Sequence, residues 1–102
     1  MTDQLYYLLL RTLPLGTSGA EVILHGPEAQ AAADALGRVN IGLPRTFQPH
    51  ECAQLARWLG DDTLPGDAAR VIDHVVSRLS DGRVVTVELR PSGDSRVLRR
   101  PL

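Results

Sequence analysis

Residues 66–90, GDAARVIDHVVSRLSDGRVVTVELR, decide the fold, because the spacing of apolar residues changes from helical to strand-like at a single glycine. Before that glycine, apolar residues recur every three or four positions, which predicts an amphipathic helix over 66–80. Its apolar face consists of Ala68, Val71, Ile72, Val75, Val76 and Leu79. Gly82 is the predicted C-cap, since many helices end on a glycine in the left-handed conformation. From Arg83 to Arg90 apolar and polar residues alternate, which predicts a strand with Val85, Val87 and Leu89 facing inward.

Two strands and two helices are predicted upstream of this unit. Residues 5–13 and 20–25 read as strands, and the short connection between them favours an antiparallel hairpin. The first run is apolar on both faces, which predicts a strand covered on both sides, and alternation in the second places Val22 and Leu24 on one face. Helices are predicted from Gly26 to about 37 and over 49–59, with 38–46 irregular between them. The apolar face of the second helix is Cys52, Leu55, Ala56 and Leu59.

A last strand is predicted over 95–100, where the high arginine content suits an exposed sheet edge. The predicted fold is therefore an α+β domain with the order β-β-α-α-α-β-β, in which helices pack on one side of a small antiparallel sheet. At 102 residues the chain fits one such domain, spanning 1–102.

Composition indicates which cellular compartment and which kind of organism to expect for this protein. A lone cysteine offers no internal disulfide, and the apolar run of six residues near the start is too short for a signal peptide or a membrane span. We therefore expect a cytoplasmic protein without a membrane partner. All eleven basic residues are arginine, which is typical of a high-GC genome, so a bacterial or phage origin is expected.

No pattern for catalysis, metal binding or cofactor binding is found. The sequence has no glycine-rich phosphate loop, dinucleotide fingerprint or nucleophile elbow. His50, Glu51 and Cys52 are adjacent on a predicted helix, where successive side chains point about 100° apart and cannot converge on one ion. Cys52 is read as a packing residue of the apolar face. Catalytic residues, metal ligands and cofactors are each predicted to be none.

Charge divides the chain at Gly82. Up to that residue the chain has six Arg and ten Asp or Glu, and beyond it five Arg and two Asp or Glu. The net charge of −1 is therefore the sum of a negative part and a positive C-terminal segment. We interpret the hairpin 83–100 as a partner-binding surface, with Arg90, Arg96, Arg99 and Arg100 as contact residues, because arginine is enriched at interfaces. Trp58, at the margin of its helix face, is the other predicted contact residue.

Two helices followed by an arginine-rich hairpin is also the element order of a winged-helix nucleic-acid binder. In that alternative, helix 66–80 would enter the groove and 83–100 would form the wing. The polar face of the helix, however, carries Asp67 and Asp73, with Asp81 just beyond its end, and these carboxylates would repel phosphate.

The stretch 75–98, VVSRLSDGRVVTVELRPSGDSRVL, resembles the helix–glycine–strand–turn–strand segment of bacterial antitoxins of the Phd/YefM type. Those antitoxins typically begin with this unit, whereas here it comes last, and no residue role is carried over. The expected function is a non-catalytic protein-interaction or regulatory module, such as an antitoxin-like inhibitor, adaptor or assembly factor. Its partner is expected to be another protein or a second copy of the chain, with nucleic acid as the alternative.

Overall fold

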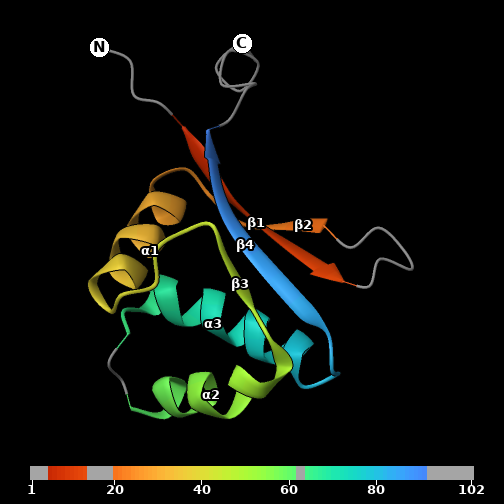
Figure 1. Ribbon diagram of the computed structural model, residues 1–102. Helices are drawn as coiled ribbons and strands as arrows, with labels where there is room; N and C mark the ends of the chain where they lie inside the picture. Colours follow the sequence, from red (N-terminus) through yellow and green to blue (C-terminus); the bar gives the residue numbers. More distant parts are fainter. Residues whose placement is uncertain (1–4, 14–19, 62–63, 92–102) are drawn as a thin grey trace.

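The computed structural model describes residues 5–13, 20–61 and 64–91 (Figure 1). Four strands, three α-helices and one short 3-10 helix follow one another along these residues. In chain order they are β1 (Tyr6–Leu13), β2 (Ala20–His25), α1 (Gly26–Arg38), β3 (Arg45–Phe47), the 3-10 turn Pro49–Glu51, α2 (Cys52–Gly60), α3 (Gly66–Leu79) and β4 (Val84–Pro91).

All neighbouring strands of the sheet are antiparallel, and their order is β2-β1-β4-β3. The pairing of β1 with β4 is the longest, since it runs from Tyr6 opposite Pro91 to Leu13 opposite Val84. On the other side of β4, the three residues of β3 pair with Val85 to Val87. β4 is therefore an interior strand, and β2 and β3 form the two edges.

The core lies between the sheet and the helices, which cover one of its faces (Figure 1). Alternate residues of β1 and β4 point into it: Leu8, Leu10, Val85 and Val87 are fully buried. From the helical side, α3 contributes Val71, Ile72, Val75 and Leu79, as its spacing predicts. α1 contributes mainly alanines, which allow the helix to approach its neighbours closely, and α2 buries only Leu55.

The α+β class, the three helices and the antiparallel sheet packed by helices on one side are confirmed. The predicted order is found along the described chain with one addition, β3, which begins within the segment 38–46 that was expected to be irregular and ends at Phe47. The predicted strand 95–100 lies outside the described residues. Gly82 takes the expected positive φ, 78°, and its N–H donates to the carbonyl of Leu79.

Two local predictions are wrong, and a third holds only in part. A register shift between Leu8 and Leu9 breaks the alternation of β2, so Leu24 is buried while Val22 is 43% exposed. Ala56 is exposed, because α2 packs at the periphery. The prediction that β1 is covered on both sides holds in part: the described helices cover one face, and on the other face Leu9 is buried while Leu13 is 39% exposed.

A candidate binding groove

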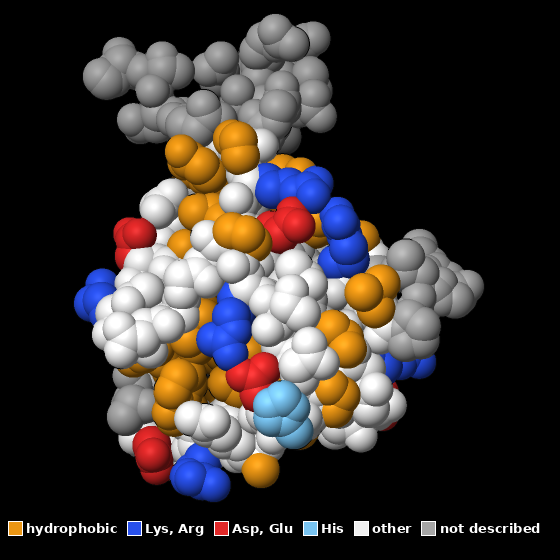
Figure 2. All heavy atoms as spheres, viewed as in Figure 1, with side chains coloured by type: hydrophobic (Ala, Val, Ile, Leu, Met, Phe, Trp, Pro, Cys, Tyr) orange, Lys and Arg blue, Asp and Glu red, His pale blue; other side chains and the backbone are white. Residues whose placement is uncertain are grey.

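A groove of about 260 Å³ opens between α2 and the segment that runs from the end of α1 through β3. Figure 2 shows it at the lower left as a hollow in which hydrophobic side chains gather, next to a basic and an acidic side chain. We call it the β3–α2 groove. Its lining residues are Val39, Asn40, Ile41, Arg45, Phe47, Glu51, Gln54, Leu55 and Trp58.

The floor of the groove belongs to the core. Ile41, Phe47 and Leu55 are each buried, with exposed fractions of 2%, 1% and 4%. They come from three successive elements: the turn after α1, β3, and α2. The groove is therefore a product of packing between segments, and its apolar floor is held in place by the same contacts that stabilise the domain.

The turn after α1 sets one wall. The N–H groups of Val39 and Ile41 both donate to the carbonyl of Leu36, at 3.1 and 2.9 Å, so the chain reverses immediately after the helix. Asn40 occupies the left-handed region at φ 69°, which asparagine tolerates better than most residues. As a result, Ile41 enters the core while Val39 and Asn40 remain at the groove.

Arg45 and Glu51 form the polar end of the groove. The Arg45 guanidinium lies over the Phe47 ring, with Cζ 4.6 Å from the ring centroid, and forms an ion pair with Glu51. Arg45 Nε–H also donates to the Thr46 carbonyl at 3.3 Å. Glu51 in turn accepts the Gln48 backbone N–H on its other oxygen at 2.8 Å. This chain of contacts fixes the guanidinium in one position.

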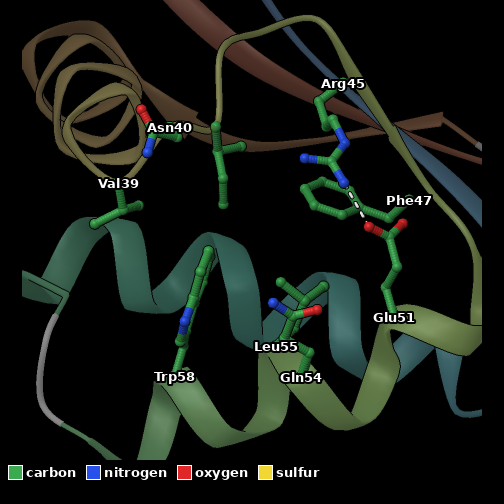
Figure 3. A pocket seen from close by; sticks show the side chains of 9 residues that line it. Val39, Asn40, Arg45, Phe47, Glu51, Gln54, Leu55 and Trp58 are labelled. Carbon is green, nitrogen blue, oxygen red and sulfur yellow. Dashed lines mark hydrogen bonds and ion pairs between the residues drawn. The ribbon is translucent and has the colours of Figure 1, made fainter.

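Trp58 rises from α2 into the groove, opposite Val39 (Figure 3). The side chain is half-buried and packs against the edge of the core. The sequence-based placement of Trp58 at the margin of its helix is therefore correct, although its role as a contact residue stays a prediction. Tryptophan at a pocket wall supplies a large, rigid contact area with few rotatable bonds.

The structure does not bring Trp58 together with Arg90, the one predicted arginine contact among the described residues. Arg90 lies at the far end of β4 from α2 (Figure 1), where its Nε–H donates to Glu88 Oε1 at 2.5 Å. The hydrogen bonds that Arg90 donates to Glu88 and Tyr7 raise the pKa of Arg90 above its ordinary value, so its charge is engaged within the sheet. Arg96, Arg99 and Arg100 lie outside the described residues, and their contact role stays a prediction.

Other polar groups are paired within the domain. Both arginines of α3 are engaged by carboxylates: Arg70 with Glu28 at 3.4 Å, and Arg78 with Glu21 of β2. Cys52 is half-buried, and its thiol donates weakly to the Val76 carbonyl at 3.8 Å. Within residues 5–13, 20–61 and 64–91, no group of three or more His, Cys, Asp or Glu side chains is placed to hold a metal ion.

Of the residues that line the groove, only Trp58 was predicted from the sequence to be a site residue. The segment 38–46 was read as irregular, and Arg45 was therefore given no structural role. A usable signal was the triplet Arg45-Thr46-Phe47, which contains a β-branched threonine and the only phenylalanine of the chain, two residue types that are enriched in strands. Three residues are too few to distinguish a strand from a loop by periodicity.

No helix in the described part of the chain has both the length and the apolar character needed to cross a membrane. Comparison with protein-family models, with curated proteins and with solved structures finds no match to this chain.

Proposed function

We propose that this protein is a non-catalytic interaction module that binds a protein partner by accepting one apolar side chain of the partner in the β3–α2 groove. The observation that carries the proposal is the groove itself, with its buried apolar floor, its tryptophan wall and a polar end that is already ordered. An inhibitor, adaptor or assembly factor of a bacterium or phage would use such a surface.

The size of the groove supports a side chain rather than a cofactor. Pockets that enclose drug-sized ligands and cofactors measure about 300–1,000 Å³. The groove, at about 260 Å³, is smaller and is open to solvent along α2. It has room for one large apolar side chain, which is how protein interfaces place their most important contact residues in pockets.

The polar groups of the groove suit positioning rather than catalysis. Glu51 is its one carboxylate, and both of its oxygens already accept hydrogen bonds, from Arg45 and from the Gln48 N–H. Asn40 and Gln54 are amides, which neither take up nor release protons in the physiological range. We therefore assign Glu51 the role of holding Arg45.

A protein partner is also favoured over nucleic acid on α3. A helix that enters a DNA groove uses free cationic side chains to contact phosphates. Arg70 and Arg78, the arginines of this helix, face Glu28 and Glu21 of the same domain. β4, which the winged-helix alternative requires as one arm of a projecting wing, lies between β1 and β3 inside the sheet.

The test is a selection of phage-displayed random dodecapeptides on the immobilised protein, followed by titration of synthetic copies of the enriched peptides. Trp58 is the only tryptophan, so the intrinsic tryptophan fluorescence of the protein reports on the groove alone. We expect the enriched peptides to share one large apolar residue and to shift the Trp58 emission on binding.

Two substitutions on α2 make the test specific. Gln54 lines the groove and Ala53 does not, yet both are exposed, so Gln54→Phe and Ala53→Phe add the same side chain to the same helix. We expect Gln54→Phe to weaken peptide binding at least about tenfold by filling the groove, and Ala53→Phe to leave it within about twofold. Equal affinities of the two variants, or the absence of a shared apolar residue, would refute the proposed site.

A further inference from the structure

We infer that the partner segment carries a carboxylate within two residues of the apolar side chain, and that this carboxylate binds the guanidinium of Arg45. The inference rests on the proposed function and specifies its partner as an acidic peptide segment. It follows from the hydrogen-bonding capacity that remains unused at the polar end of the β3–α2 groove.

Arg45 has donors to spare. A guanidinium carries five N–H groups. One, on Nε, donates to the Thr46 carbonyl, and one terminal nitrogen faces Glu51. Figure 3 shows the other terminal nitrogen of Arg45 pointing away from Glu51 and into the groove. Some N–H donors of the guanidinium are therefore paired within the domain, and its other terminal nitrogen points to the side where a ligand would lie.

The acceptor oxygens at this end of the groove, by contrast, each already accept one hydrogen bond from the domain itself. One oxygen of Glu51 accepts the Arg45 guanidinium and the other accepts the Gln48 N–H. The Thr46 carbonyl accepts Arg45 Nε–H. A ligand therefore meets unmatched donors here, and the ligand group that best complements a guanidinium is a carboxylate, which can receive two parallel N–H bonds.

The guanidinium is also held in place before any ligand arrives. Its stacking on the buried Phe47 ring and its ion pair with Glu51 restrict a side chain that otherwise has many rotamers. Binding then orders less of the protein, and less of the interaction energy is lost as entropy. The Arg45 side chain is 36% exposed, so solvent screens the contact and limits its contribution to about fivefold in affinity.

Outside the positive C-terminal segment, the chain gives an acidic peptide no general reason to bind. Up to Gly82 the chain carries six Arg against ten Asp and Glu, so its long-range field repels carboxylates. Any preference for acidic residues beside the apolar anchor must therefore come from a local contact. Arg45 is the arginine that lines the groove.

The experiment applies the dodecapeptide selection in parallel to the wild-type protein, Arg45→Gln and Arg78→Gln. Arg78 is a matched control, because it is also a half-buried arginine paired with a carboxylate, but it lies between α3 and β2. We expect Asp and Glu to be enriched within two residues of the shared apolar residue on the wild type and on Arg78→Gln, and not on Arg45→Gln.

A double-mutant cycle then measures the contact. One enriched peptide and its Glu→Gln copy are titrated against wild type and Arg45→Gln, and each single change is expected to weaken binding about fivefold, with little further loss when both are combined. Comparison of the two peptides on the wild type needs no protein variant, so the inference is tested even if Arg45→Gln is destabilised. If the peptides share an apolar residue without acidic enrichment, the inference is wrong and the proposed function stands. If they share no apolar residue, the proposed function itself is wrong.

Discussion

Val75 stands at the centre of α3 with no exposed surface, between the helices and the sheet. We expect Val75→Asp to unfold the domain, because an unpaired buried carboxylate costs several kcal/mol and a domain of this size is stable by about 5–15 kcal/mol. Ser77, two residues along the same helix, is exposed, so Ser77→Asp should leave the melting temperature nearly unchanged. Circular dichroism during thermal unfolding measures both. A Val75→Asp protein that melts like the wild type would show that this face of α3 is not buried.

Substitution of Cys52 tests whether the lone thiol has a chemical role. Its side chain is half-buried at the start of α2 and its one polar contact is the weak bond to the Val76 carbonyl. Cys52→Ala is therefore expected to lower the free energy of unfolding by about 1 kcal/mol and to leave peptide binding unchanged. Urea denaturation and the Trp58 titration check the two parts. Loss of peptide binding in a stably folded Cys52→Ala protein would reverse this view.

At the scale of elements, Gly82 joins α3 to β4 in the left-handed conformation, with nothing within 4 Å of the position a Cβ would take. Gly82→Ala is therefore expected to cost about 1–2 kcal/mol through backbone conformation alone, without a steric clash. Gly60 is the matched control, since it also has open space around it but sits in α2 without a positive φ. Gly60→Ala should be neutral or stabilising by about 0.5–1 kcal/mol. Urea unfolding of both variants checks the difference, and equal stabilities would contradict the conformational argument.

The length of each element largely determines whether it could be predicted from the sequence. α3 and β4 are predictable because their apolar spacing is sustained over 14 and 8 residues, long enough for one period to dominate. β3 is too short for that, and its identity as a strand depends on pairing with β4, some 40 residues later in the chain. Val22 was predicted to share a face with Leu24 but is exposed, because the pairing of β2 with β1 shifts its register. No property of β2 alone predicts that shift.

The groove is less predictable than the fold for the same reason. Trp58 was identifiable as a margin residue of an amphipathic helix. Arg45, Phe47 and Ile41 acquire their roles only when β3 pairs with β4 and α2 packs beneath it. Glu51 was noticed as a neighbour of His50 and Cys52 on one helix, yet its partner is Arg45, six residues earlier on a strand. Interactions between elements of different type leave no periodic trace in the sequence.

For the whole molecule, the groove and the end of β4 are separate places. Phe47 of the groove pairs with Val85, and β4 continues six residues further to Pro91. At about 3.3 Å per residue, the end of β4 lies about 20 Å from that point. The Debye length at physiological salt is about 8 Å, so a charge at the end of β4 has little influence on a carboxylate in the groove. Substitutions in the groove and at Arg90, near the end of β4, therefore report on two different surfaces.

The triple variant Arg96→Ser, Arg99→Ser and Arg100→Ser compares the proposed groove with the predicted C-terminal contact residues, which lie outside the described residues. The variant should melt like the wild type, because the pairing of β4 with β1 and β3 involves none of the three residues. We expect it to bind the selected acidic peptide within about twofold of the wild type at 0.15 M salt, while Gln54→Phe does not. A loss of about fivefold or more in the triple variant would instead support the C-terminal arginines as the contact surface.

Titration with a mixed-sequence DNA duplex at several salt concentrations tests the remaining alternative. A nucleic-acid binder would show a steep log–log dependence of affinity on salt in the wild type, and the slope would flatten by up to about one for each phosphate contact removed by the substitutions. We expect no such binding, since the helix that would have to enter the DNA groove has both of its arginines paired with carboxylates of its own domain.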